Sequence, residues 1–149
     1  MDTNLKNKLE QYCAYQERCK YDVIQKAKKL NILDDEIDGY LQYLESNNFL
    51  NETRFVTSFV EGHFYQKKWG KNKIKQALQQ KKIASNLIAT ILADLDKNDV
   101  AETILGLAQK KWNSIKSDNA MEKKQKVIRF LLGRGFAYSD IAEAMKKVS

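Results

Sequence analysis

Residues 74–92 read IKQALQQKKIASNLIATIL, and the apolar positions of this stretch decide the fold. They are spaced by 4, 5, 5 and 4 residues, at Ile74, Leu78, Ile83, Ile88 and Leu92. A spacing of four places two side chains on the same face of a helix. The stretch therefore predicts two amphipathic helices joined by a turn at Ile83.

The same spacing occurs twice more in the chain. A shift of 51 residues toward the N-terminus or 53 toward the C-terminus again finds only apolar side chains, at Val23, Ala27, Ile32, Ile37 and Leu41 and at Val127, Leu131, Phe136, Ile141 and Met145. Self-similarity at such a period is typical of a repeat array, in which neighbouring units share apolar surface.

A further amphipathic segment precedes each helix pair, from residue 5 to about 16, from 52 to about 67 and from 99 to about 115. An extra polar stretch at residues 113–122 indicates a longer loop or an extended first helix in the third copy. No segment alternates with period two, and the chain has no proline. We predict an all-α protein, an elongated and curved array of three tandem three-helix repeats over residues 1–49, 50–96 and 97–149.

The turn inside each helix pair imposes a further requirement. A helix end of this kind often places one residue in the left-handed backbone region. Asn31 and Gly135 stand one step before the central apolar residue and suit this geometry, whereas Lys82 adopts it at a greater cost. Side chains shortly afterwards can accept hydrogen bonds from the first amide groups of the next helix, namely Asp34, Ser85 and Ser139.

Nothing in the sequence supports catalysis, a metal or a cofactor. Phosphate-loop, dinucleotide-binding and zinc-protease motifs are all absent. Cys13 and Cys19 are six residues apart, which favours buried apolar fillers over a metal pair or a disulfide. His63 has no second ligand nearby, and the acidic run at residues 34–38 fits the start of a helix. We therefore expect a protein that acts by binding and is not an enzyme.

No apolar run is long enough to cross a bilayer, and the first residues lack the order of a signal peptide. We therefore expect a cytoplasmic protein without a membrane partner. We also expect it to be a monomer.

Positive charge concentrates in the middle of the chain. Residues 62–93 carry a net charge of +7, against −3 for residues 1–61 and +3 for residues 94–149. Within this region, basic and aromatic side chains interleave over residues 63–75 (HFYQKKWGKNKIK). Such a run can attract phosphate or an acidic protein face. The candidate binding residues are Lys67, Lys68, Trp69, Lys71, Lys73 and Lys75. In the alternative interpretation, the aromatic residues pack in the core and the lysines form a solvated helix surface.

A second basic cluster lies on the equivalent helix of the third repeat. It adds five candidate residues for binding a partner or DNA: Lys123, Lys124, Lys126, Arg129 and Arg134. The sequence leaves open whether the two clusters are neighbours in space.

Three stretches resemble the RecX family of recombination regulators. They are residues 49–56 (FLNETRFV), 68–78 (KWGKNKIKQAL) and 127–141 (VIRFLLGRGFAYSDI). Together with the periodicity, the resemblance covers nearly the whole chain. It implies a bacterial, non-enzymatic regulator that binds the RecA recombinase and its filament on single-stranded DNA. Such a regulator would inhibit the ATPase, strand-exchange and coprotease activities of RecA, in recombination, repair and the SOS response.

Two positions depart from the family pattern. Asn51-Glu52 stands where many members carry paired acids, and Lys82 stands where glycine is usual. Two other functions stay open at this level. One is direct binding to single- or double-stranded DNA by stacked units of the helix-turn-helix kind. The other is a helical scaffold whose lysines serve solubility.

Overall fold

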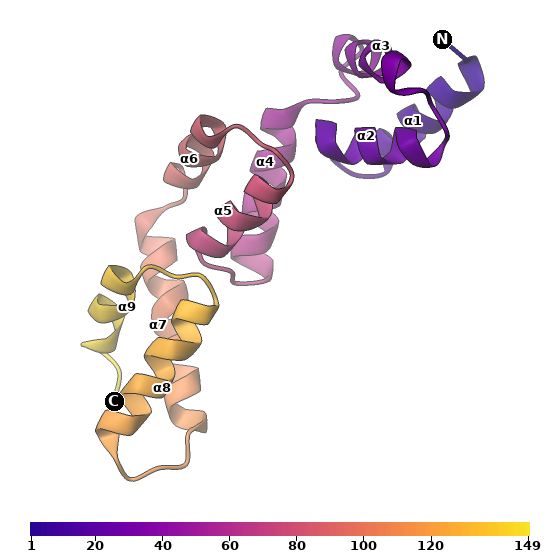
Figure 1. Ribbon diagram of the computed structural model, residues 1–149. Coiled ribbons are helices and arrows are strands. Elements are labelled where there is room, and N and C mark those ends of the chain that lie inside the picture. Colours follow the sequence, from indigo (N-terminus) through magenta and orange to yellow (C-terminus); the bar gives the residue numbers. More distant parts are fainter. The chain divides into compact units, whose positions relative to one another are not determined.

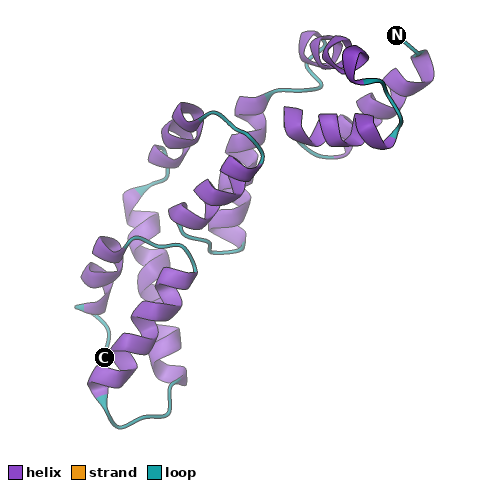
Figure 2. Cartoon of the chain, viewed as in Figure 1, coloured by secondary structure: helices purple, strands orange, loops and turns teal.

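The computed structural model describes residues 1–149, and every regular element in it is a helix (Figure 1). Figure 2 shows helices joined by short loops and no strand. No helix combines the length and apolar character that crossing a membrane requires. In chain order the elements are α1 (Thr3–Tyr15), α2 (Lys20–Lys29), α3 (Asp34–Ser46), α4 (Glu52–Glu61), the π-helix η1 (Gly62–Gln66), α5 (Lys71–Gln80), α6 (Ser85–Ala93), α7 (Lys97–Ser114), α8 (Ala120–Gly133) and α9 (Tyr138–Met145).

The predicted all-α repeat architecture is confirmed. Each repeat contributes three successive helices, and η1 continues α4 in the second repeat. All fifteen positions of the apolar pattern are buried, the most exposed being Met145 at 8%. The pattern identifies the core because the apolar residues that a helix buries must recur on the same face of that helix.

The left-handed residues expected in the turns are also present. Asn31 and Lys82 both have φ 62°, and Gly135 has φ 94°. In each turn the next amide reaches back five residues, an arrangement that satisfies a free carbonyl at the helix end. These bonds are Ile32 N to Ala27 O (3.0 Å), Ile83 N to Leu78 O (3.3 Å) and Phe136 N to Leu131 O (3.2 Å).

The expected side-chain caps are wrong at all three turns. Asp34 and Ser85 are already the first residues of α3 and α6, and Ser139 is the second residue of α9. The residues at the cap positions of α3 and α9 are Leu33 and Ala137, whose side chains cannot accept a hydrogen bond. Asp34 instead contributes negative charge to the first turn of α3, near the positive end of the helix dipole.

The extra polar stretch of the third repeat lengthens helices more than the loop. The loop between α7 and α8 covers residues 115–119, only one residue more than the loop at residues 67–70. In contrast, α7 has 18 residues against 15 in α4 and η1 together, and α8 has 14 against 10 in α5. The stretch therefore extends the first helix, as one of the two sequence interpretations had it, and it also extends the second helix, which the sequence did not predict.

The fold forms two compact units, and their boundary runs through the second repeat. Unit 1 comprises residues 1–59 and 78–88. In it α1 packs against α2 and α2 against α3. The buried cluster of unit 1 consists of Leu9, Cys13, Val23, Ala27, Ile32, Ile37, Tyr40, Leu41, Leu44 and Leu50.

Both cysteines are buried in unit 1, as the sequence predicts for apolar fillers. Burial raises the pKa of the Cys13 and Cys19 thiols to about 11. Next to them, Asp22 accepts from the backbone amide of Cys19 (3.3 Å) and forms an ion pair with Lys81 (2.6 Å). This carboxylate thus caps α2 and ties it to the turn after α5.

Unit 2 comprises residues 60–77 and 89–149. In it α7, α8 and α9 pack against one another, as they lie in Figure 1. Two glycines of this unit bring their backbones into direct contact. Gly70 N donates to Arg134 O (2.7 Å), and Asn72 N donates to Gly135 O (3.0 Å). A Cβ on Gly70 would lie 2.2 Å from the carbonyl carbon of Gly135, so no side chain fits there.

We predict that Gly70→Ala lowers the free energy of unfolding by about 2–3 kcal/mol, because the new methyl group collides with backbone that cannot move aside. Gly106→Ala is the control, since Gly106 lies inside α7 with open space around its Cβ. This control should stabilise the protein by about 0.5–1 kcal/mol. Urea unfolding followed by circular dichroism measures both. Equal stability of the two variants would contradict the close approach.

Lys82 provides a second prediction. A non-glycine residue at φ 62° carries strain of about 1 kcal/mol, so Lys82→Gly should raise the free energy of unfolding by about that amount. Gln76→Gly, at an exposed position inside α5, should lower it by a similar amount. The same unfolding experiment tests the pair, and destabilisation by Lys82→Gly would refute the strain.

Candidate partner-binding surface

The whole net charge of the protein resides in unit 2. This unit contains 16 lysine and arginine residues against 9 acidic ones, a net charge of +7. Unit 1 contains 10 of each kind and is neutral. Both basic clusters expected from the sequence lie in unit 2. The candidate surface is therefore confined to one of the two units.

The first cluster begins in a turn that the π-helix shapes. After η1, Lys68 N bonds to Phe64 O (3.1 Å) and Trp69 N bonds to His63 O (2.9 Å), which are four and six residues back. The corresponding bonds at Asn31 and Ile32 reach three and five residues back. The turn at Lys68, which has φ 56°, is thus one residue wider than the other turns. Lys67 and Lys68 both project from it into solvent.

Trp69 is half-buried and takes part in packing. The centre of its ring lies 4.6 Å from the centre of the His63 ring. Lys73, on α5, places its Nζ 4.3 Å from the centre of the Trp69 ring. The neighbouring Tyr65 hydroxyl donates to Asp99 of α7 (2.7 Å), which raises the pKa of Tyr65 and fastens η1 to the third repeat. Of the aromatic residues in this run, Phe64 is fully buried. The packing interpretation therefore describes Phe64, and Trp69 combines packing with a cation on its face.

Arg134 joins the two predicted clusters. Its guanidinium Nη2 donates to Lys67 O (2.7 Å) and Lys68 O (3.1 Å). Arg134 therefore belongs to the second cluster in sequence but lies against the first cluster in space. Nη2 is used inside unit 2, and Nε is buried without a hydrogen-bond partner, so we assign Arg134 the role of holding the basic turn in place.

The remaining candidate cations differ in whether another side chain of the protein already engages them. Lys123 Nζ lies 4.3 Å from the centre of the Trp112 ring, and Lys126 forms an ion pair with Glu122 (3.1 Å). No ion pair engages the other exposed cations of the two clusters, Lys67, Lys68, Lys75, Lys124 and Arg129. These side chains are available to an anionic partner.

Lys71 lies apart from them. It lines a groove together with apolar residues, among them Val100 and Leu105 of α7 and Ala144 of α9. The lining also includes both acidic and basic residues, namely Glu102, Asp140, Glu143, Lys97 and Lys147. The mixed charges give this groove no preference for an anion.

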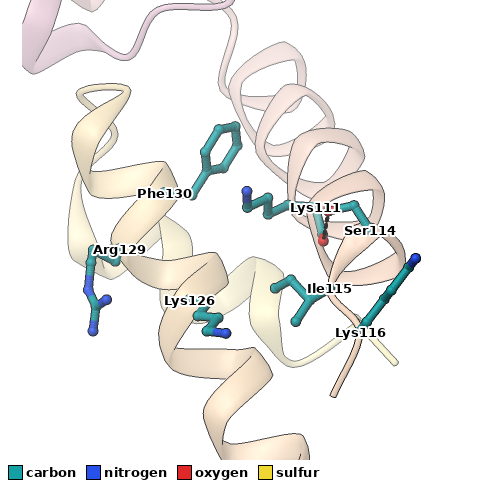
Figure 3. A pocket seen from close by; sticks show the side chains of 7 residues that line it. All are labelled: Lys111, Ser114, Ile115, Lys116, Lys126, Arg129 and Phe130. Atoms are coloured by element: carbon teal, nitrogen blue, oxygen red, sulfur yellow. Dashed lines mark hydrogen bonds between the residues drawn. The ribbon is translucent and has the colours of Figure 1, made fainter. Parts of the chain in front are cut away.

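A second groove, between the end of α7 and α8, is lined by cations from both helices (Figure 3). Its cavity volume is about 460 Å³. Its lining comprises Lys111, Ser114, Ile115, Lys116, Lys126, Arg129 and Phe130, without a carboxylate. Sequence reasoning selected Lys126 and Arg129 but missed Lys111 and Lys116. The only available signal was the basic character of the end of α7, where Lys110, Lys111 and Lys116 follow one another without an acid.

Taken together, these features define a helical-repeat protein with one strongly basic unit, suited to contact with a macromolecule. A model described as the third three-helix domain of RecX matches residues 98–145, and one described as the second three-helix domain of RecX matches residues 51–92. The two matches cover more than half of the chain. The chain belongs to the RecX family of regulatory proteins.

Individual relatives agree with this assignment. The regulatory protein RecX of Vibrio campbellii is 30% identical over 125 residues, which cover 84% of this chain and 79% of the relative. The regulatory protein RecX of Clostridium botulinum is 34% identical over 124 residues, 80% of this chain. The chain spans only 58% of that clostridial relative. The crystal structure of RecX from Lactobacillus salivarius superposes with a TM-score of 0.90 at 25% identity, over 98% of this chain and 95% of that one.

We predict that Arg134→Ala lowers the free energy of unfolding by about 1–3 kcal/mol, because two carbonyl groups lose a charged donor. Lys124→Ala, at an exposed position of α8, the helix that ends just before Arg134, should change it by less than about 0.5 kcal/mol. Denaturant titration compares them. If Arg134→Ala leaves stability intact while it weakens binding of a partner, Arg134 is a binding residue instead.

Proposed function

We propose that this protein regulates the RecA recombinase by binding the RecA filament on single-stranded DNA. It acts in the cytoplasm as a monomer and inhibits the ATPase, strand-exchange and coprotease activities of the filament. Membership of the RecX family carries the proposal. The protein needs no chemistry of its own for this role, because a bound protein that hinders subunit motion is sufficient.

The distribution of charge supports a polyanionic partner. A filament on DNA offers phosphate groups and acidic protein surface to the same ligand, and unit 2 carries the complementary charge. Long-range attraction of this kind accelerates encounter and favours approach with unit 2 first. A neutral unit 1 adds no competing attraction.

Direct DNA binding is the alternative, and one observation favours it. In all three repeats the second and third helices are joined by four-residue turns, at residues 30–33, 81–84 and 134–137. Helix-turn-helix modules have turns of this length and insert the second helix of the pair into the major groove.

The charges on the third helices oppose that mode of binding. None of α3, α6 and α9 contains a lysine or arginine. Helix α3 opens with Asp34, Asp35 and Glu36, which DNA phosphates would repel. A helix-turn-helix mode would therefore place an uncharged or acidic helix in the groove, and we prefer the filament as partner.

The test is RecA ATP hydrolysis on single-stranded DNA, with and without this protein, at two salt concentrations. We expect inhibition at protein concentrations far below those needed to coat the DNA. Binding to naked DNA is measured in parallel, and it should be weaker and steeply dependent on salt. Unchanged ATP hydrolysis alongside tight DNA binding would favour the alternative, and unchanged hydrolysis without DNA binding would refute both.

A charge-reversal set separates these functions from that of a simple scaffold. Lys67→Glu, Lys68→Glu and Lys75→Glu together should weaken inhibition at least tenfold while the helical circular dichroism signal persists. The matched control reverses Lys8, Lys28 and Lys29, three exposed lysines of unit 1. Equal inhibition by the two variants would show that the basic turn has no specific role.

A further inference from the structure

The groove between α7 and α8 differs from the basic turn, because cations from two helices and the loop between them line one hollow. Lys111 and Lys126 are directed into the space between the helices, whereas Lys116 and Arg129 extend at its outer sides (Figure 3). A ligand lying across the groove would therefore meet cations from α7, from the loop after it and from α8.

Three of these four cations, Lys111, Lys116 and Arg129, have no acidic partner. Neither Lys116 nor Arg129 forms an ion pair, and both side chains are exposed. Lys111 Nζ lies over the Phe130 ring at 5.0 Å. Lys126 contacts Glu122 at 3.1 Å, but this pair is solvent-exposed and weak enough to exchange for a stronger anion. The groove therefore holds more positive charge than the protein itself neutralises.

The helix dipole does not account for this excess. The C-terminal end of α7 carries a partial negative charge of about half a unit, and one nearby lysine suffices to balance it. Part of that end is already satisfied, because Ser114 Oγ donates to Lys111 O (2.7 Å) and Ile115 N donates to Trp112 O (3.2 Å). Three further cations remain for an external anion.

The lining favours a phosphodiester chain over an acidic protein. A protein partner usually anchors on exposed aromatic residues in a desolvated pocket, but the one aromatic residue here, Phe130, is half-buried and covered by Lys111. Long, flexible cations contributed by both helices suit a polymer with uniformly spaced negative charges.

We propose that the groove formed by Lys111, Lys116, Lys126 and Arg129 binds the phosphate backbone of single-stranded nucleic acid without reading its sequence. The proposal deepens the proposed function, since it rests on a RecA filament that carries such a strand. It assigns the DNA contact to the third repeat and leaves the basic turn of the second repeat for the protein part of the filament.

The test uses the full chain and a dye-labelled deoxythymidine oligonucleotide, with affinity measured by fluorescence anisotropy over a range of salt. The variant combines Lys116→Glu with Arg129→Glu. The control combines Lys8→Glu with Lys28→Glu, which changes the net charge equally but lies in unit 1. Circular dichroism and urea unfolding verify that both variants fold.

We expect the groove variant to lose at least tenfold in affinity at low salt. The slope of the logarithm of affinity against the logarithm of salt concentration should fall by about 1.4, for two lost phosphate contacts. The control should lose less than threefold. An equal loss in both variants would mean that only net charge matters, and the groove would not be a site. Loss of RecA inhibition with unchanged oligonucleotide binding would assign the groove to protein contact and overturn the proposal.

Two further outcomes separate this inference from the proposed function. If the unaltered protein inhibits RecA but does not bind the oligonucleotide, the inference fails and the proposed function stands. If it binds the oligonucleotide through the groove but leaves RecA ATP hydrolysis unchanged, the proposed function fails and the groove remains a nucleic-acid site.

Discussion

The contact between the two glycine turns is the constraint on which unit 2 depends. Because Gly70 touches Gly135 through its backbone, the start of α5 and the turn after α8 share hydrogen bonds and leave no room for a side chain. Arg134 adds two bonds from the same turn to the preceding loop. The lysines of that loop therefore stand on a backbone held from two directions, and only their side chains remain free to adapt.

A feature of this structure can be predicted from the sequence when the residues that interact lie close together along the chain. Burial of fifteen pattern residues and the left-handed backbone at Asn31, Lys82 and Gly135 depend on local periodicity and turn chemistry, which a sequence carries directly. The inward role of Arg134 depends on contacts with residues 66 and 67 positions away, which no spacing encodes. The groove cations Lys111 and Lys116 are equally unpredictable from the sequence, since they join Lys126 and Arg129 in one groove only when α7 and α8 pack.

The segregation of charge relates this fold to its family role. A neutral unit 1 and a unit 2 of net charge +7 make the molecule electrically polar, although the three repeats share one apolar pattern. The repeats agree where residues are buried and differ where they are exposed. The geometry that the three repeats share thus leaves the surface of each repeat free to differ in charge.

The π-helix at Gly62–Gln66 bears on how such an array changes over evolutionary time. One residue added to a regular helix would rotate every later side chain by about 100° and carry the core residues out of register. A turn widened by one residue absorbs the addition locally, since Phe64 before the turn and Ile74 after it both remain buried. Duplicated segments of such a chain can therefore gain or lose a residue and still pack. The unequal shifts of 51 and 53 residues between the copies show that the segments joining the helix pairs do differ in length.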